Sequence, residues 1–468
     1  MNAKLLGTIL ALSTLVSGAK SADIAKPNII LIFCDDLGYG DLGCYGSTKN
    51  RTPNIDQLAK DGLRFTNFYS SSPVCTPSRA SLLTGCYPRR IGMHEDSTGH
   101  WVLIPQSRRG LNPNELTIAE ALKSQGYKTA CVGKWHLGDQ PEHLPTQHGF
   151  DYYFGIPYSN DMQSKGRGDP PLPLVQQETV IEAPANQATI TSRYTEEVVS
   201  FIEKNQASPF FVYLPHTFPH VPIFASPDFL GKSKNGRYGD SVEEIDWSTG
   251  QILKCLNRLK IADNTLVIFT SDNGSNGRNG GSNAPLSGAK GSTMEGGMRV
   301  PMIARWSGRV PANKMCDELS TTMDFLPTLS AIAGALLPEK KIDGFDISKM
   351  LYGEKHAKSR YESFCYFRRR QLQAIRAGDW KYHLPLAETH PNWNSSQRVG
   401  PGRTAKLFDL KNDPAEKHNV AKSNSEVIKR MEALAVNAIY TLGNDNIQGS
   451  EQRDALTLES SKPMLLKK

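Results

Sequence analysis

Cys75 is the first residue in this chain whose surroundings point to chemistry. We expect a helix to begin just after it, because Thr76 can serve as the N-cap, Pro77 suits the first helical position and Gly85 suits the end. A side chain at a helix N-terminus meets free backbone N–H groups and the positive end of the helix dipole, which favour an anion. Arg79 follows one helical turn later, so its guanidinium can point back toward position 75. The pattern indicates a nucleophile beside an anionic group. The alternative is a buried cysteine before an ordinary capped helix, with Arg79 on the surface.

Acidic residues follow two of the apolar runs directly. Asp35 and Asp36 come after the first run, and Asp272 and Asn273 come after a later one. Neighbouring carboxylates repel each other unless a cation neutralises them, and an oxygen-only donor set suits Ca²⁺ or Mg²⁺ better than zinc. Each motif alone is typical of a turn or a helix cap. Their shared position at strand ends favours a metal site.

Basic side chains lie in three further segments. Lys134 and His136 are two residues apart and would share a face of an extended segment, where a lysine could bind an anion and a histidine could move a proton. His216 and His220 lie among prolines after another apolar run, and Lys290 lies in a glycine-rich loop, 288–297. A surface lysine or a packed histidine is the alternative for each of them.

The elements that must position these residues alternate along the chain. Apolar runs typical of strands buried on both faces lie at 28–34, 128–132, 210–214 and 266–270. Helical patterns lie at 117–125, which begins like a capping box, and at 191–205 and 241–260. Such alternation predicts a doubly wound, mainly parallel α/β sheet whose carboxyl edge carries the candidate residues.

The pattern changes near residue 350. Strand-like segments lie at 361–367, 374–384 and 406–410, followed by a helical pattern at 423–442. We therefore predict a main domain over 24–350 and a smaller α+β domain over 351–468.

Composition narrows the setting. Residues 1–19 read as a signal peptide, with a basic start, an apolar centre and small residues at the end, and no other stretch is apolar enough to cross a membrane. The net charge of +7 comes from scattered basic residues, so no nucleic-acid partner is indicated. The eight cysteines lack zinc-site spacing; most of them read as structural, and their pairing stays open.

The order of these motifs carries a family resemblance. The chain resembles the type I, formylglycine-dependent sulfatases of the alkaline-phosphatase superfamily, and most of all the arylsulfatase A and N-acetylgalactosamine-6-sulfatase types. The resemblance covers about residues 27–345. It rests on D-D-x-G-Y-G at 35–40, C-T-P-S-R at 75–79, G-K-W-H-L-G at 133–138, P-H-x-P at 219–222, S-D-N-G at 271–274 and A-K-G-S-T-x-E-G-G at 289–297. It implies a large mixed, mainly parallel sheet sandwiched by helices, and a sulfuric ester hydrolase.

The resemblance also implies two cofactors. A formylglycine-generating machinery would oxidise Cys75 to Cα-formylglycine during maturation. Asp35, Asp36, Asp272 and Asn273 would bind one Ca²⁺ together with the modified residue 75.

The remaining roles follow from the same resemblance. Arg79 would stabilise the hydrated aldehyde, and Lys134 and Lys290 would hold sulfate oxygens. His136 would act as the base on the hydrate. His220 would protonate the leaving alcohol, in preference to the other histidine of its loop. The implied reaction passes through a covalent sulfo-enzyme intermediate.

Substrate and location are the least determined properties. We expect an exported protein, periplasmic or secreted, or lysosomal or extracellular in a eukaryote, that acts on a sulfated carbohydrate from a chain end or on a small sulfate ester. Candidate specificity segments are 94–109, 158–175 and the cluster 368–370, which is otherwise a solvated basic turn. Alternatives are a phosphate or phosphonate ester hydrolase of the same superfamily and a non-catalytic exported glycan-binding protein.

Overall fold

A ten-stranded sheet forms the centre of the molecule. The computed structural model describes residues 26–163, 165–386 and 404–467, so the predicted signal peptide, 1–19, lies outside the described residues. In sheet order the strands are β12 (Lys314–Cys316), β2 (Leu63–Phe65), β11 (Met302–Arg305), β10 (Thr265–Ser271), β1 (Asn28–Cys34), β9 (Phe210–Pro215), β5 (Lys128–Val132), β6 (Tyr152–Gly155), β7 (Leu174–Gln176) and β8 (Thr179–Glu182). The five strands from β10 to β6 are parallel, and antiparallel pairs flank them. The mainly parallel mixed sheet is therefore confirmed, and so are its four predicted strands.

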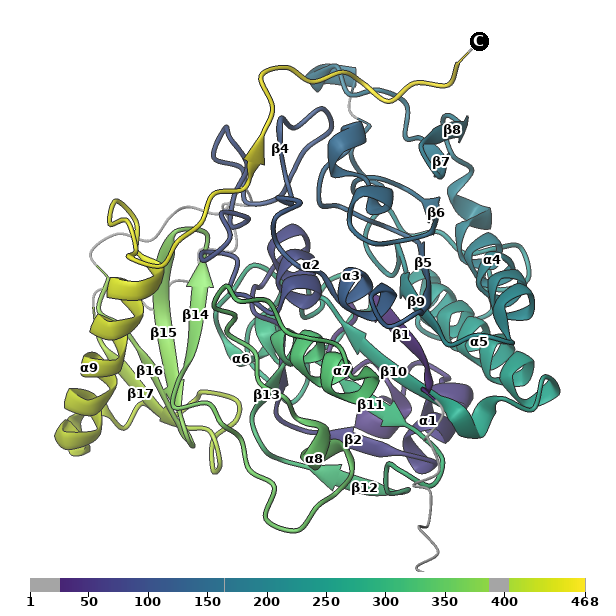
Figure 1. Ribbon diagram of the computed structural model, residues 1–468. Helices are drawn as coiled ribbons and strands as arrows, with labels where there is room; N and C mark the ends of the chain where they lie inside the picture. The colour runs from purple at the N-terminus through teal and green to yellow at the C-terminus, as the bar shows by residue number, and fades with distance from the viewer. Residues whose placement is uncertain (1–25, 164, 387–403, 468) are drawn as a thin grey trace, which may run out of the picture.

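Helices cover both faces of the sheet. Successive residues of β1, such as Leu31 and Ile32, belong to two separate apolar clusters, because successive side chains of a strand point to opposite faces. One cluster includes residues of α2 (Cys75–Thr84), α3 (Ile118–Lys123), α7 (Phe325–Ala333) and α8 (Ser348–Leu351). The other includes residues of α1 (Pro53–Lys60), α4 (Ile190–Asn205) and α5 (Gly236–Arg258). Figure 1 shows α4 and α5 on one side of the sheet and α2, α3 and α7 on the other.

The predicted helix boundaries hold in part. Helix α3 has the expected capping box between Thr117 and Glu120. Helix α5 starts at Gly236, five residues before the predicted start. The prediction that Thr76 caps α2 is wrong: Val74 is the N-cap residue, and Cys75 is the first residue of the helix.

Long-range contacts explain this difference at α2. The Thr76 hydroxyl donates to the backbone oxygen of His136 at 3.0 Å and accepts from the backbone N–H of Leu103 at 3.1 Å, so it serves tertiary contacts instead of the cap. Pro77 accordingly lies in the third helical position, where its missing N–H is still harmless. Gly85 ends the helix in the left-handed region with φ of 67°, as predicted.

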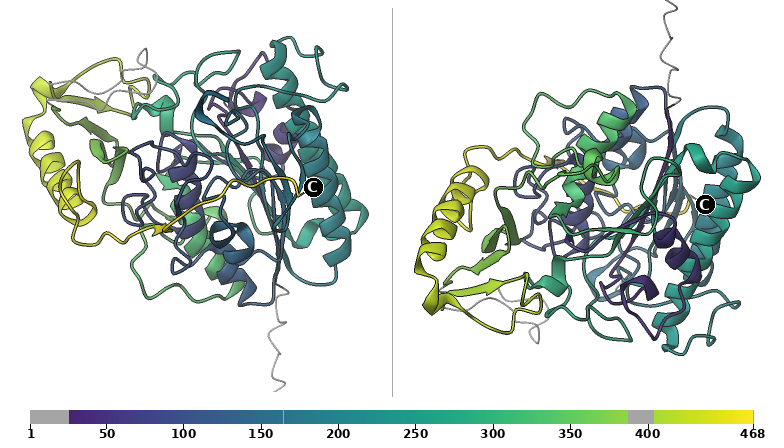
Figure 2. Two further views of the ribbon diagram at one scale, coloured as in Figure 1. Left: turned by 90° about the horizontal axis from the view of Figure 1, so that it is seen from above. Right: turned by 90° about the horizontal axis from the view of Figure 1, so that it is seen from below.

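A smaller antiparallel sheet forms the C-terminal domain. Its strands, in order, are β14 (Phe364–Arg368), β15 (Gln371–Ala377), β16 (Trp380–His383) and β17 (Lys406–Asp409), and α9 (Ser425–Leu442) packs on them. The segment 374–384, which we predicted as strand, contains the turn between β15 and β16. Figure 2 shows this domain beside the main one. Tyr69, Met298 and Met323 of the main domain belong to its apolar cluster, so the two domains share a packed boundary.

The segment after α9 leaves the C-terminal domain and returns to the main one. Its strand β18 (Leu456–Thr457) pairs with β4 (Arg109–Gly110), and Arg453 forms an ion pair with Glu115 at 2.7 Å. In Figure 1 this segment crosses the top of the molecule. No local pattern in the sequence indicated this path.

The cysteines and the helices bear on two further expectations. All eight cysteines lie in the described ranges as free thiols, and five of the seven other than Cys75 are buried, as expected for structural residues. Within the described ranges, no helix combines the length and apolar character that crossing a membrane requires.

Candidate active site

The candidate residues meet at one edge of the sheet. Strands β10, β1, β9 and β5 are adjacent and parallel, so their carboxyl ends lie side by side. Asp272, Asp35, His216 and Lys134 each follow one of these strands within two residues. This is the edge at which open α/β sheets bind ligands.

The acidic residues form a cluster in which some ligand oxygens have no hydrogen-bond partner. Asp272 Oδ1 accepts from the backbone N–H of Asp36 at 3.1 Å, and Asn273 Nδ2 donates to Asp36 Oδ1 at 2.8 Å. Asp35 Oδ1 and Asn273 Oδ1 are buried without a hydrogen-bond partner. Ligand atoms of Asp35, Asp36 and His220 lie within 4.8 Å of one another. An unpartnered, oxygen-rich donor set of this kind fits a hard dication.

Electrostatics in the cluster also fit a cation. Burial and then the negative charge of Asp35 raise the pKa of Asp272 to about 7. Burial would also raise the pKa of Asp35. The positive charge of Lys134, followed by that of His220, outweighs burial and lowers the pKa. Asp36 adopts a φ of 65°, which non-glycine residues rarely do, and such backbone strain concentrates at functional sites.

Arg79 is buried inside this cluster, so its alternative position on the surface is wrong. Its Nη1 donates to the backbone oxygen of Lys134 at 2.9 Å, and its Nη2 donates to Asp272 Oδ2 at 2.8 Å and lies 3.5 Å from Asp35 Oδ2. Its guanidinium also lies 5.5 Å from the ring centroid of Phe33. Arg79 therefore ties α2 to the ends of three strands.

The Cys75 side chain is almost fully buried among these charges. Burial raises the pKa of its thiol to about 11, although Lys134 and Lys290 oppose the shift. At neutral pH the unmodified thiol would stay protonated and would be a weak nucleophile.

Two lysines reach the acids from different segments. Lys134 Nζ contacts Asp35 and donates to Ser159 Oγ at 3.0 Å, and Lys290 Nζ lies 2.8 Å from Asp36 Oδ1. Neither lysine is the solvated surface residue of the alternative reading. Nothing in the sequence pattern singled out Ser159.

The Lys290 loop is held against the helix that carries Cys75. The backbone N–H of Gly291 donates to the oxygen of Pro73 at 2.8 Å. A Cβ at Gly274 would lie 1.9 Å from the backbone oxygen of Gly296, so only glycine permits this approach. The loop ends in a short helix, α6 (Glu295–Met298), which the glycine-rich sequence did not predict.

His136 has one ring nitrogen available. Its Nε2 lies 2.9 Å from the backbone oxygen of Leu103, which only accepts, so Nε2 carries the proton and Nδ1 has a free lone pair. That Nδ1 is buried without a partner, and burial followed by the charge of Lys134 lowers the pKa of the ring. With φ of 60°, His136 is not extended, so the shared face predicted for Lys134 and His136 does not apply.

The geometry separates the two loop histidines. His220 Nε2 lies 3.9 Å from Asp36 Oδ2, and its Nδ1 contacts Asn160 Oδ1 at 3.1 Å and the oxygen of Val221 at 2.5 Å. His216 is buried, neither of its ring nitrogens has a hydrogen-bond partner, and burial lowers its pKa to about 3. Only His220 joins the acidic cluster.

The segment after β6 adds two residues that the sequence analysis did not single out. Asn160 is buried and orients the His220 ring, while its own Nδ2 donates to Gln187 Oε1 at 2.9 Å. Asp161 has a buried, unpartnered Oδ1; burial opposes its charge, but His220 and then Lys134 lower its pKa. Both lie in the segment 158–175, but only the folded chain brings them to His220.

The basic cluster 368–370 packs against another predicted specificity segment, so its interpretation as a solvated turn is wrong. Arg368 is buried, with its guanidinium 5.3 Å from the ring centroid of Trp101. Arg369 donates to the backbone oxygen of Gly99, and Arg370 Nε donates to Glu95 Oε1 at 2.5 Å. The two segments form one boundary between the domains.

Taken together, the centre has the parts for hydrolysis of an anionic ester. Three cationic side chains surround the helix N-terminus that carries Cys75, and an acidic cluster with free donor oxygens lies beside them. One histidine offers a free lone pair, and a second faces the acids.

Sequence comparisons agree with this geometry. Residues 27–335 match the protein-family model described as Sulfatase, and residues 290–438 match the model of the C-terminal region of N-sulphoglucosamine sulphohydrolase. The chain is 37% identical to human arylsulfatase A over 94% of both chains. It is 40% identical to N-acetylgalactosamine-6-sulfatase of Canis lupus familiaris over 80% of this chain and 75% of that one.

Solved structures show the same fold. A chain from a glycosaminoglycan-metabolism locus of Bacteroides thetaiotaomicron matches with a TM-score of 0.79 at 31% identity, covering 88% of this chain and 99% of that one. Ps i-CgsB in complex with k-i-k-neocarrahexaose matches with a TM-score of 0.75 at 34% identity, covering 91% of this chain and 94% of that one.

Proposed function

Because the chain belongs to the sulfatase family of sulfuric ester hydrolases, we propose that it removes sulfate from a sulfated carbohydrate, with Cα-formylglycine made from Cys75 as its nucleophile. One observation carries this proposal. Cys75 begins a helix at the carboxyl edge of four parallel strands, among buried cations and beside an acidic cluster with unpartnered oxygens.

The cofactors fit the residues that surround them. Asp35, Asp36, Asp272 and Asn273 would hold Ca²⁺, and two of them carry the unpartnered oxygens. Hydrated formylglycine supplies a nucleophilic hydroxyl and a second hydroxyl for release of sulfate, and Ca²⁺ supplies positive charge beside the sulfate oxygens. The raised pKa of the Cys75 thiol supports the need for this modification.

The basic side chains bind and orient the sulfate. Lys134 and Lys290 reach the centre from different segments and can donate to sulfate oxygens as charge develops on them. Arg79 bonds to Asp272 and holds its own charge next to residue 75, which favours an anionic oxygen at that position.

The two histidines divide the proton transfers. His136 is neutral, with Nε2–H fixed on Leu103, so its Nδ1 can accept a proton from the hydrate. His220 has its Nδ1–H held by the oxygens of Asn160 and Val221, so in the doubly protonated ring its Nε2 is the nitrogen that can pass a proton to the departing alcohol oxygen.

A carbohydrate substrate is supported by the relatives and by burial. One relative is named for a sulfated amino sugar, and one solved structure holds an oligosaccharide. Cys75 and His220 are 3% and 4% exposed, so the centre suits a terminal sulfated residue better than the middle of a chain. We further propose export, to the periplasm or outside the cell, since 1–19 has the composition of a signal peptide.

Mass spectrometry of the peptide that contains residue 75 tests the nucleophile. Conversion to formylglycine lowers its mass by about 18 Da, the difference between CH₂SH and CHO at the proposed nucleophile. A fully active enzyme with an unmodified thiol would contradict the proposal.

Kinetics test the ester class. We expect kcat/KM for p-nitrophenyl sulfate to exceed that for p-nitrophenyl phosphate by at least tenfold, and a panel of defined sulfated sugars to yield a substrate cleaved only at a terminal residue. A clear phosphate preference would reverse the assignment to a phosphate or phosphonate ester hydrolase.

A further inference from the structure

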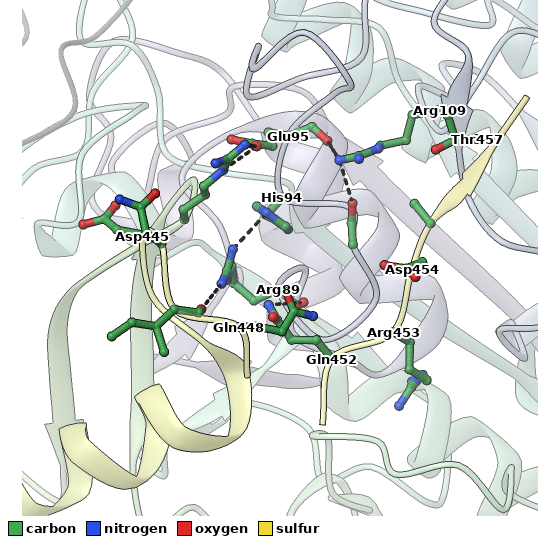
Figure 3. A pocket seen from close by; sticks show the side chains of 15 residues that line it. Arg89, His94, Glu95, Arg109, Asp445, Gln448, Gln452, Arg453, Asp454 and Thr457 are labelled. Atoms are coloured by element: carbon green, nitrogen blue, oxygen red, sulfur yellow. Dashed lines mark hydrogen bonds and ion pairs between the residues drawn. The ribbon is translucent and has the colours of Figure 1, made fainter. Parts of the chain in front are cut away.

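A cavity of about 660 Å³ lies where the C-terminal segment returns to the main domain, apart from the centre around Cys75 (Figure 3). It is lined by Arg89, Arg109 and Arg370, by three residues between 92 and 95, and by residues of the returning segment between 445 and 457. None of its lining residues belongs to the centre around Cys75. Arg89 follows the C-terminal end of α2, and a helix of 10 residues spans about 15 Å, so the cavity and Cys75 lie toward opposite ends of α2.

Arg89 places a buried positive charge in this cavity; burial lowers the pKa of its guanidinium, and the charges of Glu95 and Asp445 only partly offset that effect. Its Nε donates to the backbone oxygen of Leu442 at 3.1 Å, and its Nη1 donates to His94 Nε2 at 3.0 Å. Among the described residues, no carboxylate forms an ion pair with it. Burial and then the charge of Arg89 lower the pKa of His94, so the neutral ring accepts from the guanidinium through Nε2.

Arg109 is a second guanidinium of the same kind. Its Nη1 donates to the backbone oxygens of Glu95 at 2.9 Å and Gly92 at 3.5 Å, and its Nε is buried without a hydrogen-bond partner. It too forms no ion pair with a carboxylate in the described part of the chain. Backbone carbonyls hold its orientation but do not balance its charge.

The other two arginines that line the cavity are already neutralised. Arg370 pairs with Glu95, and Arg453 pairs with Glu115, which does not line the cavity. Figure 3 shows Arg453 directed away from Arg89. Arg89 and Arg109 are thus the two lining arginines that form no ion pair with a carboxylate among the described residues.

The returning C-terminal segment adds polar groups that suit hydroxyls to the wall of the cavity. Asp445, Gln448, Gln452 and Asp454 come from the returning C-terminal segment (Figure 3). Carboxylates and side-chain amides accept or donate hydrogen bonds to sugar hydroxyls. The volume is within the range of small-molecule sites, about 300–1,000 Å³.

We propose that this cavity is a second, non-catalytic binding site for an oxyanion, with a sulfate group as its ligand, either free or carried on a sugar. Planar guanidiniums bind sulfate-like oxyanions through paired N–H groups, and neither Arg89 nor Arg109 forms an ion pair with a carboxylate in the described part of the chain. The polar wall of the C-terminal segment then meets the sugar that carries the sulfate. The proposal does not depend on the reaction at Cys75, because the two sites share no residue.

Calorimetric titration of the full chain tests it. The titrants are methyl β-D-galactopyranoside 6-sulfate, its unsulfated parent and sodium sulfate at constant ionic strength, and a Cys75→Ala background prevents turnover. We expect two sites per chain for a sulfated ligand. Arg89→Gln and Arg109→Gln should each weaken binding in the cavity at least tenfold. Lys290→Met should weaken binding at the centre around Cys75.

Arg108→Gln is the matched control. Arg108 is exposed, lies outside the cavity and donates to the backbone oxygen of Glu459 at 3.0 Å, so its loss should leave both sites intact. Arg109 is partly exposed, so Arg109→Gln tests the site even where the buried Arg89 variant fails to fold. Tighter binding of the sugar sulfate than of free sulfate identifies a glycan ligand, and equal binding identifies the free anion.

A single site that responds to Lys290→Met and not to the arginine variants would overturn the proposal. Absence of sulfatase activity alongside intact cavity binding would overturn the proposed function alone.

Discussion

Replacement of Lys381 by methionine should destabilise the protein more than any surface change. Lys381 Nζ lies 2.9 Å from Glu295 Oε1, 3.0 Å from Glu416 Oε1 and 3.9 Å from the ring centroid of Tyr366, and the side chain is fully buried. Lys381 belongs to the C-terminal sheet, whereas Glu295 begins α6 of the main domain. The ammonium group therefore connects the two domains.

The expected loss of unfolding free energy follows from the two carboxylates, Glu295 and Glu416, that the variant leaves buried. Removal of one partner of a buried ion pair costs about 3–5 kcal/mol, because the other charge stays uncompensated. Burial would raise the pKa of Glu295, but Lys381 and then Arg299 and Arg376 lower it from 4.5 to about 2. A shift of that size corresponds to about 3 kcal/mol, in agreement with the first figure.

The depressed pKa of Glu295 determines how the unfolding free energy changes with pH. Its stabilising contribution is present above pH 4.5, the ordinary value, and is lost as the pH falls through about 2. Wild-type protein should therefore lose about 3 kcal/mol of unfolding free energy between pH 4.5 and 2 from this group, and Lys381→Met should lose much less.

Urea unfolding at pH 7, pH 4.5 and pH 2 measures both effects. We expect Lys381→Met to lower the unfolding free energy by about 3–5 kcal/mol at pH 7. It should also lower kcat, because Glu295 anchors the loop that carries Lys290. Lys358→Met is the control: its pair with Glu318 is exposed and should contribute less than about 1 kcal/mol. A Lys381 variant within 1 kcal/mol of wild type would refute this reasoning.

Three further predictions concern the catalytic centre. Removal of Ca²⁺ by EDTA, or Asp36→Asn, should lower both Tm and activity, with recovery on added Ca²⁺ only in the wild type; full activity without the metal would contradict this assignment. Lys290→Met should lower kcat/KM for p-nitrophenyl sulfate by about 10²–10³-fold through loss of a donor to the transition state, and a change under threefold would exclude that role. His220→Gln should lower kcat more for sugar sulfates, whose leaving alcohol needs a proton, than for p-nitrophenyl sulfate, whereas His216→Gln should change both less than threefold; equal losses with both esters would argue against His220 as the acid.

Much of the fold and the centre was predictable because the signals are local. Buried parallel strands consist of continuous apolar runs, so β1, β5, β9 and β10 were found within one residue of their ends. Parallel strands place their carboxyl ends at one edge of the sheet, so their order in the sequence predicted that Asp35, Asp272 and Lys134 lie together.

The missed features all depend on partners far along the chain. Thr76 has the composition of a cap, yet His136 and Leu103 engage its hydroxyl instead. Ser159 and Asn160 have no distinctive local pattern, and only the loop after β6 brings them to Lys134 and His220. The return of the C-terminal segment depends on pairing between residues more than 300 positions apart.

The amino-acid sequence alone predicted the chemistry that we propose for this protein, since residue types and their order along alternating strands indicate a nucleophile, a cation site and an anion site. Tertiary structure decided which side chains are paired and which are left free. It placed Arg79 in the core, separated His220 from His216, and left Arg89 and Arg109 without an ion-paired carboxylate among the described residues. The physical reason is that pairing and burial are properties of contacts between distant segments, and those contacts exist only in the folded chain.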